Sequence, residues 1–461
     1  MALIVTSEYE LNRVVAPRLP TAPPDYEKRY HDQFADVLRL YFNRLDNILG
    51  QLVATMETIP VTIGGTNLDA FGRLRVSNPL TLFDSSHRYA DNNLWVSSIT
   101  GTAAATFSAD EGLVNLTVGS ASGDEIIRET TKVFSYQPGK SLLVMNTFVF
   151  GTAKAGLRQR AGYYGAANGI YFERDGSTNY MVERSSVTGA PINTRVAQAD
   201  WNQDPLDGTG PSGLTLDSSK AQILYMDVEW LGLGTVRTGF IINGAFVPCH
   251  NFDHANLVNT TYITTASLPL RYEMTNTAAT TGASTLKQVC STVISEGGYE
   301  LRGAQLSAGI PITTPKTLTT AGTVYPIVAF RLKSTRLDAI AILTAISILG
   351  VTNNANYQWS VVANGATTGG TWVSAGTNSA VEYNITGTAF SSTGGRILAT
   401  GYFQGSNQGA NSVDILKEAL FTTQLERNPF TATAYEITLA CTAASNGDQV
   451  LGSLDWEEIS R

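Results

Sequence analysis

Two carboxylates two positions apart, Asp227 and Glu229, are the strongest candidates for acid–base chemistry in this sequence. Side chains at positions i and i+2 of a β-strand lie on the same face, and glycoside hydrolysis requires a pair of carboxyl groups. A third acid in the row is missing, because Leu231 follows, and we expect Arg237 on the next strand to neutralise Glu229. The pattern therefore favours a solvated strand face over a catalytic site.

A second cluster, of Cys249, His250, Asp253 and His254, has side chains that bind metals. Two histidines four positions apart come together on a helix. Pro248 and the alternating residues before it predict a strand instead. We therefore expect a loop that returns to the core, and we predict no metal site and no cofactor.

Residues 200–208 spell DWNQDPLDG, which spaces Asp200, Asp204 and Asp207 as the oxygen ligands of a calcium loop are spaced. A proline stands where an EF-hand needs glycine, and no glutamate completes the twelve positions. Calcium binding is left open, with a long exposed loop as the alternative. On such a loop, Trp201 is a candidate for stacking on a glycan or for a subunit contact.

Composition excludes several classes of function. Only 15% of the 461 residues are charged and the net charge is −8, which disfavours a nucleic-acid partner. The cysteines Cys249, Cys290 and Cys441 are odd in number and widely spaced, which favours a reducing compartment. The sequence starts without a signal-peptide pattern and contains no apolar run of membrane-spanning length. We therefore predict folding in a cytoplasm, without membrane insertion.

The chain after Leu82 alternates apolar and polar residues between turn signals, which predicts a mainly β protein. We expect hairpins at 174–177 and at Asn243-Gly244, and antiparallel pairing of 221–231 with 235–243 that places Met226 opposite Phe240. These strands predict a jelly-roll or lectin-like β-sandwich over residues 61–310. A linker near 302–320 and a second β-rich domain over 321–461, with a short helix at 413–426, are predicted to follow.

The amino-terminal part differs from the rest. Four prolines predict an extended arm over residues 1–24, and an amphipathic helix is expected over residues 25–60. Its apolar positions alternate in steps of four and three, as in a heptad seam. The seam residues are Phe34, Leu38, Tyr41, Leu45, Ile48 and Leu52. The pattern fits both a short parallel coiled coil and a single helix docked on its own β-domain or on a partner.

Between helix and sandwich, residues 66–84 form a predicted joint. Its segment 69–77, DAFGRLRVS, alternates basic and apolar residues after Asp69 and Phe71, so Arg73 and Arg75 would share one strand face. We expect that face to meet a carboxylate of the body or of a neighbouring copy.

The same segment, followed by LFD at 82–84, resembles a signature of virion structural proteins of tailed bacteriophages, notably marine cyanophages. Further stretches that resemble this group are LPTAPPDY (19–26), LYFNRLDN (40–47), DEGLVNLTV (110–118), YQPGKS (136–141) and LKQVCSTVISEGGY (286–299). The resemblance extends over roughly residues 15–310 and excludes the carboxy-terminal domain. No catalytic residues come with it.

The resemblance implies a position in a virus particle. We expect a non-enzymatic component of the tail fibre, tail or baseplate, assembled in the host cytoplasm and attached through the arm and helix as a homo-oligomer, most simply a trimer. Its partners would be other tail or capsid proteins and a host-surface glycan. The alternatives are a capsid decoration protein and a tail-associated polysaccharide depolymerase that uses Asp227 and Glu229.

Overall fold

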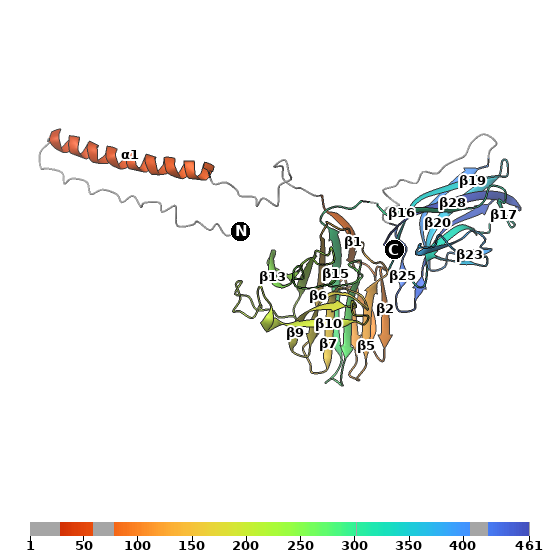
Figure 1. Ribbon diagram of the computed structural model, residues 1–461, viewed down its shortest axis with the longest axis horizontal. Coiled ribbons are helices and arrows are strands. Elements are labelled where there is room, and N and C mark those ends of the chain that lie inside the picture. The colour runs from red at the N-terminus through yellow and green to blue at the C-terminus, as the bar shows by residue number, and fades with distance from the viewer. Residues whose placement is uncertain (1–27, 59–77, 301, 406–422, 461) are drawn as a thin grey trace. The chain divides into compact units, whose positions relative to one another are not determined.

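A computed structural model describes residues 28–58, 78–300, 302–405 and 423–460 of the chain (Figure 1). Within these ranges the protein is mainly β, as the sequence predicts, with one α-helix, near the amino terminus. The helix belongs to one compact unit and all the strands belong to a second. Among the described residues, no helix has both the length and the apolar character needed to cross a bilayer.

Helix α1 spans Lys28–Thr58, close to the predicted range. Its apolar residues recur every three or four positions, which places them in one stripe along the helix. The opposite side is polar, and Arg39 donates to Asp36 at 2.8 Å one turn away. The predicted arm at 1–24 lies outside the described residues.

The first sandwich begins with a sheet that we call the first sheet. Its strands are β1 (Leu80–Ser86), β3 (Ala104–Ser108), β4 (Leu113–Val118), β6 (Leu142–Val149), β11 (Gln222–Val228), β12 (Val236–Ile242), β13 (Ala245–Phe252) and β15 (Ser284–Ser295). They are antiparallel and lie in the order β13-β12-β11-β6-β15-β4-β3, with β1 also paired to β15.

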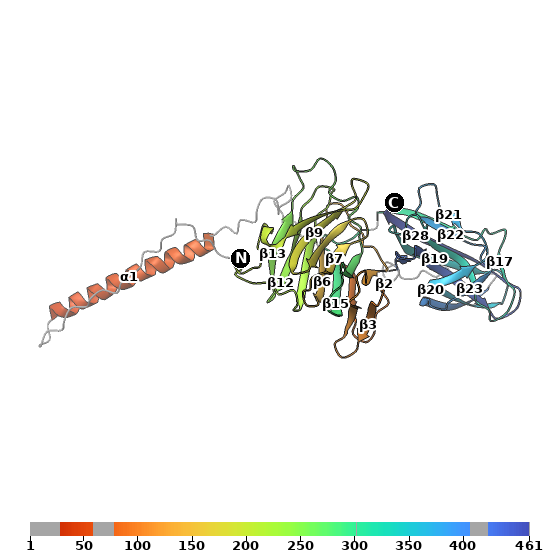
Figure 2. The same cartoon turned by 90° about the horizontal axis from the view of Figure 1, so that it is seen from below.

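A second sheet faces it, and Figure 2 shows strands of both sheets from below. Its strands are β2 (Trp95–Thr100), β5 (Glu125–Thr130), β7 (Leu157–Tyr164), β8 (Gly169–Asp175), β9 (Thr178–Ser185), β10 (Ile192–Ala197) and β14 (Leu270–Asn276). Their order is β10-β9-β8-β7-β14-β5-β2. Connections that cross between two antiparallel sheets give the predicted jelly-roll-like topology.

Alternation along each strand creates the core of this sandwich. In β6, Leu142, Val144, Asn146 and Phe148 are fully buried, while the residues that alternate with them are only partly buried. Phe148 from the first sheet and Phe172 from the second have ring centroids 6.1 Å apart, and Phe240 contacts Phe172 at 5.2 Å. Each buried phenylalanine contributes about 1.5–3 kcal/mol by leaving water.

Two tight turns form where the sequence predicts them. Asn243 and Gly244 have φ values of 53° and 78°, which the two central positions of a type I′ turn require. Gly176, with φ of 61°, turns the chain from β8 into β9.

The turn between β11 and β12 corrects the predicted register. Met226 pairs with Thr238 rather than with Phe240, and Asp227 rather than Glu229 pairs with Arg237. The last residue of β11 that pairs with β12 is Val228, opposite Val236, and beyond this pair the Glu229 amide donates to the Thr235 carbonyl. The shift is two residues, so the apolar side chains still point inward.

The second sandwich starts within the segment that was predicted to be a linker. One of its sheets contains β16 (Ala304–Gly309), β17 (Lys316–Leu318), β19 (Ile340–Gly350) and β28 (Asp448–Ser460), with β28 paired to the other three strands. Because β16 and β17 fall at 302–320 and pair with β28, that prediction of a linker is wrong.

The facing sheet holds the rest of this sandwich. Its strands are β18 (Tyr325–Leu332), β20 (Asn356–Thr368), β21 (Val373–Ser374), β22 (Val381–Asn384), β23 (Ala389–Ser391), β24 (Arg396–Gln404) and β27 (Glu436–Ala443). Phe330 of β18 stacks on Trp456 of β28 at 5.1 Å, which joins the two sheets. Most of the helix predicted at 413–426 lies outside the described residues.

A small hairpin of β25 (Arg427–Asn428) and β26 (Thr433–Ala434) links the two sandwiches. Arg427 is 2% exposed; it donates to Glu129 at 2.7 Å and to the Thr130 carbonyl at 3.0 Å, both on β5 of the first sandwich. Asp338 accepts a further bond from Arg427 at 2.8 Å. Nearby, Val133 lies in one apolar cluster with Ile340 and Ile342 of β19.

Candidate functional site

The seam of helix α1 is the first candidate site, because it is apolar and open. Phe34, Leu38, Tyr41 and Leu45 are partly exposed, and no residue from Lys28 to Asn47 is buried. Tyr30 stacks on Phe34 at 6.2 Å and extends the stripe by one turn. Ile48 and Leu52 continue it within the helix, although their side chains are not described. A stripe of this kind can bind a second apolar helix or a groove.

Only the end of the predicted joint lies within the described residues. Asp69, Phe71, Arg73 and Arg75 fall outside them, so the predicted basic face stays a prediction. From Leu80 the stretch is strand β1, and Phe83 is buried at 4.8 Å from Phe134. This end of the stretch is therefore part of the sandwich core, which corrects its interpretation as a joint.

The carboxylate pair of the sequence is not arranged for catalysis. Asp227 lies 2.7 Å from Arg237 in a cross-strand ion pair. Burial raises the pKa of Asp227 and Arg237 opposes that rise. Glu229 is exposed at the end of β11, beyond the last paired residue. A carboxyl group held by a guanidinium is a poor proton donor, so the two groups do not divide the roles of acid and base.

The Cys-His cluster is likewise divided between separate contacts. Cys249 is fully buried, and burial raises its pKa to about 12. His250 accepts a bond from the Asn202 amide at 3.3 Å. The ring nitrogens of His254 lie 2.6 Å from the Gly234 carbonyl and 2.7 Å from Glu183. In the part of the chain that the structure describes, no three such side chains converge on a metal position.

Glu183 and His254 form an ion pair instead. Burial alone would lower the pKa of His254, but the bonds to Glu183 and to the Gly234 carbonyl raise it overall. Both partners are acceptors, so the two contacts favour the protonated imidazole, in which both ring nitrogens donate. Tyr262 stacks flat on it at 3.9 Å.

The loop at 200–208 uses its carboxylates to hold its own turns. Asp204 accepts from the amides of Leu206 and Ser212 at 2.9 and 2.8 Å, and Asp207 accepts from Thr209 at 2.9 Å. Carboxylates that cap backbone amides in this way form Asx turns. The spacing that resembles a calcium loop is therefore explained by local turns.

Trp201 lies in the core, which corrects the prediction of a glycan contact. Its side chain belongs to the main core cluster with 5% exposure, and its indole donates to the Val196 carbonyl at 3.2 Å. Phe172 contacts the ring at 6.4 Å. Neither face of the ring is free to stack on a sugar.

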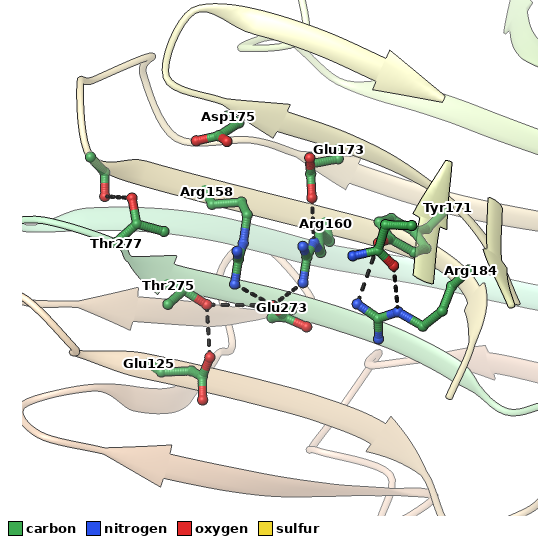
Figure 3. A network of polar contacts seen from close by, with 12 residues as sticks. Glu125, Arg158, Arg160, Tyr171, Glu173, Asp175, Arg184, Glu273, Thr275 and Thr277 are labelled. Carbon is green, nitrogen blue, oxygen red and sulfur yellow. Dashed lines mark hydrogen bonds and ion pairs between the residues drawn. The ribbon is translucent and has the colours of Figure 1, made fainter. Parts of the chain in front are cut away.

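A dense polar network lies on the outer face of the second sheet (Figure 3). At its centre Glu273 of β14 accepts from Arg160 at 2.6 Å and from Arg158 at 3.2 Å, both on β7. Arg160 also donates to Glu173 of β8 at 2.5 Å. Arg195 of β10 pairs with Glu173 at 2.5 Å and extends the network to the sheet edge.

Arginines at the other end of the face lie over tyrosine rings. Arg184 lies 5.2 Å from the Tyr171 ring and donates to the Tyr171 hydroxyl. Arg271 lies 5.5 Å from the Tyr164 ring and pairs with Glu129 at 2.5 Å. Cations over aromatic faces are stabilised by the ring quadrupole. Glu129 also forms an ion pair with Arg427, so the network continues into the second sandwich.

Each glutamate of this network is paired with at least two arginines, which determines the chemistry of its carboxylate. Burial alone would raise the pKa of Glu273, but Arg160 and Arg158 lower it overall. The result is a carboxylate that stays ionised and accepts hydrogen bonds, rather than one that exchanges protons near neutral pH. The arrangement is suited to fixing strands and the second sandwich in place.

Sequence analysis missed this network, although a signal for it exists. Residues 157–160, LRQR, and 271–273, RYE, place charged groups at every second position of strands that are otherwise apolar. Such alternation predicts a charged face on each strand. The partners of Glu273 are 113 and 115 residues away along the chain, so the pairing could not be predicted.

Fold and sites together define a class: a mainly β protein with lectin-like, jelly-roll β-sandwich architecture and one amphipathic helix. No protein-family model matches the chain, and no curated protein matches it.

Three solved structures illustrate the likeness to known folds. The carbohydrate recognition domain of Emp47p is 12% identical, with 51% of this chain and 99% of that chain covered and a TM-score of 0.28. The CBM2 module of the evolved Dit of Lactobacillus casei BL23 phage J-1 is 6% identical over 49% and 100%, with a TM-score of 0.31. Arcelin-5 of Phaseolus vulgaris is 10% identical over 48% and 100%, with a TM-score of 0.30. Likenesses this low do not bear on what the chain binds or does.

Proposed function

We propose that the protein is a non-enzymatic structural component of a tailed-phage virion, most simply a tail fibre or a tail- or baseplate-associated protein. The amino-terminal arm and helix α1 attach it to the particle as a homo-oligomer, and the β-sandwiches project toward neighbouring subunits or a host surface. Support comes from the sequence resemblance over residues 15–310, from the low content of charged residues, and from the open seam of α1.

The open seam is the observation that carries this proposal. Phe34, Leu38, Tyr41 and Leu45 follow heptad spacing on a helix whose described side chains are all at least partly exposed. An isolated helix is marginally stable in water and depends on packing of its apolar stripe. Association of three such helices buries the apolar stripe of each helix and holds three copies together.

A mass measurement of the full chain tests the anchoring role. Leu38→Glu places a charge in the seam and is expected to lower the mass measured by light scattering by about threefold, as three-helix association is lost. Leu40→Glu is the matched control, because Leu40 is 57% exposed and lies off the seam. Equal masses for wild type and both variants would refute the anchoring role.

Position in the particle needs a separate test. A reconstruction of the virion, with the number of copies counted, distinguishes a tail component present in few copies from a capsid decoration protein present in many. A chain that is absent from purified particles would overturn the proposal. Release of reducing ends from host polysaccharide, abolished by Asp227→Asn, would favour the depolymerase instead.

A further inference from the structure

The outer face of the first sheet is the other large surface of the first sandwich. Strand pairing places its residues in three parallel rows that cross β13, β12, β11, β6, β15 and β1. The first row is Phe246, Ile241, Ile223, Thr147, Cys290 and Ser86. The second row is Pro248, Gly239, Tyr225, Met145, Thr292 and Asp84. The third row is Asn251, Arg237, Asp227, Leu143, Ile294 and Thr81.

The middle of this face is apolar and open to solvent. Phe246 is 52% exposed and Ile223 is 37% exposed, while Leu143, Met145 and Ile294 are partly buried. A solvated sheet face normally alternates to polar residues. Contiguous apolar patches on a protein surface mark contacts with other molecules.

A projection and a hollow lie on the same face. Phe246 stands at the β13 edge, where its ring meets Tyr225 edge-on at 4.9 Å. Towards β1 the face has a depression of 340 Å³, lined by Met145, Ile223 and Cys290 together with the polar residues Asp84, Ser85, Ser86, Thr147, Ser291 and Thr292. A cavity of about 150 Å³ is sufficient for a benzene ring, so a phenyl side chain fits there.

The charges on the three rows do not oppose a second copy. Asp227 and Arg237 neutralise each other at 2.7 Å. Asp84 is the remaining charge, and it lies at the β1 edge, at the opposite end from Phe246. In a two-fold arrangement the two Asp84 side chains would be at opposite ends of the contact and would not repel each other.

From these observations we infer that two copies of this chain dock through the outer face of the first sheet. Phe246 of each copy enters the depression of the other, so the contact is isologous: the same patch serves on both sides. Six strands about 4.8 Å apart and three rows about 7 Å apart give roughly 600 Å² per copy, or about 1,200 Å² in all, at the lower end of specific interfaces. The inference is independent of the role of α1 and of the virion proposal.

The two-fold symmetry also fixes where the axis lies. Phe246 and Cys290 are four strands apart in the first row, and Ile223 lies midway between them. An axis that exchanges projection and depression therefore passes near Ile223. The axis runs along β11, so each Ile223 faces the other copy's Ile223, and each Asp227 lies near the other copy's Asp227, neutralised by Arg237 of its own copy. The two Cys290 side chains lie on opposite sides of the axis.

Light scattering of the full chain tests the contact. Phe246→Asp should weaken pairing by about a hundredfold, as expected for loss of a buried aromatic anchor. In the Leu38→Glu background, which removes association through α1, Phe246→Asp should halve the measured mass. Tyr402→Asp is the control, because Tyr402 is 78% exposed on β24 of the second sandwich. Leu38→Glu with and without Phe246→Asp having the same mass at equal protein concentration would overturn the inference.

Cross-linking tests the symmetry. Ile223→Cys in a Cys290→Ser background should give a two-chain product with a short bismaleimide, while the wild type, with its exposed Cys290, should give little. Paired chains in which position 223 fails to cross-link, or in which Cys290 cross-links as fast, would contradict isologous docking. The buried thiols of Cys249 and Cys441 should not react in either protein.

Discussion

The two outer faces of the first sandwich differ in how deeply their charged side chains are buried. On the second sheet, Glu273 and Glu173 are buried among arginines that neutralise them. On the first sheet, the ion pair of Asp227 and Arg237 lies beside open aliphatic side chains, and the arginine is 58% exposed. The same β-scaffold thus carries one face that is polar and buried and another that is apolar and exposed.

This contrast shows how the chain uses its faces. The polar face is occupied from within the chain, because Arg427 of the second sandwich binds Glu129 on it, and Phe430 lies 5.9 Å from Arg271. The apolar face keeps its side chains open. Directional ion pairs therefore fix the chain's own domains, whereas the less directional apolar surface is available for copies of the chain.

The sharpest way to break the comparison is to remove one carboxylate from each face. Glu273→Ala leaves buried Arg160 and partly buried Arg158 without their shared partner, and we expect a loss of about 3–5 kcal/mol in the free energy of unfolding. Asp227→Ala leaves Arg237 free to turn into solvent and should cost less than about 1 kcal/mol. Denaturant unfolding of the full chain measures both.

Equal losses for the two variants would show that the buried network is no more important than a surface pair. A loss from Glu273→Ala that Glu273→Gln fully restores would instead assign the effect to hydrogen bonding rather than charge, because glutamine keeps an acceptor without the negative charge.

A second test removes the connection between network and second sandwich. Arg427→Ala deletes the bonds to Glu129, Thr130 and Asp338, but Glu129 keeps Arg271, so the expected loss is about 2–3 kcal/mol. Calorimetry should show one unfolding transition dividing into two. Arg331→Ala, which breaks a partly exposed pair within the second sandwich, should leave the transition undivided.

The elements of the fold that depend on neighbouring residues could be predicted from the sequence. The heptad steps of α1 and the Asn243-Gly244 turn are local patterns, and both are present in the structure. The predicted register of β11 and β12 is wrong by two residues. Leu231 adopts a left-handed conformation with φ of 42°, which a leucine in the sequence gives no reason to expect.

The sites were harder to predict because burial and pairing are properties of the whole fold. Trp201 sits between polar residues in the sequence and yet is buried, since its loop folds back on the core. The partners of Glu129 include Arg427, 298 residues further along the chain. The apolar face of the first sheet is visible only when distant strands are placed side by side.

The smallest expected effect is a difference in pH dependence between the two faces. The pKa of Glu273 is lowered from its ordinary value of 4.5, so this group contributes stability above that pH and loses it as pH falls. The pKa of Asp227 is raised from 3.8, so its contribution is present at low pH and lost as pH rises through the folded-state pKa. Glu273→Gln should therefore flatten the acid limb of the stability curve, and Asp227→Asn should steepen it, each by less than about 1.4 kcal/mol per pH unit for one proton. Changes of the same sign in the two variants, measured by unfolding from pH 3 to pH 7, would mean that the two carboxylates do not differ as their surroundings require.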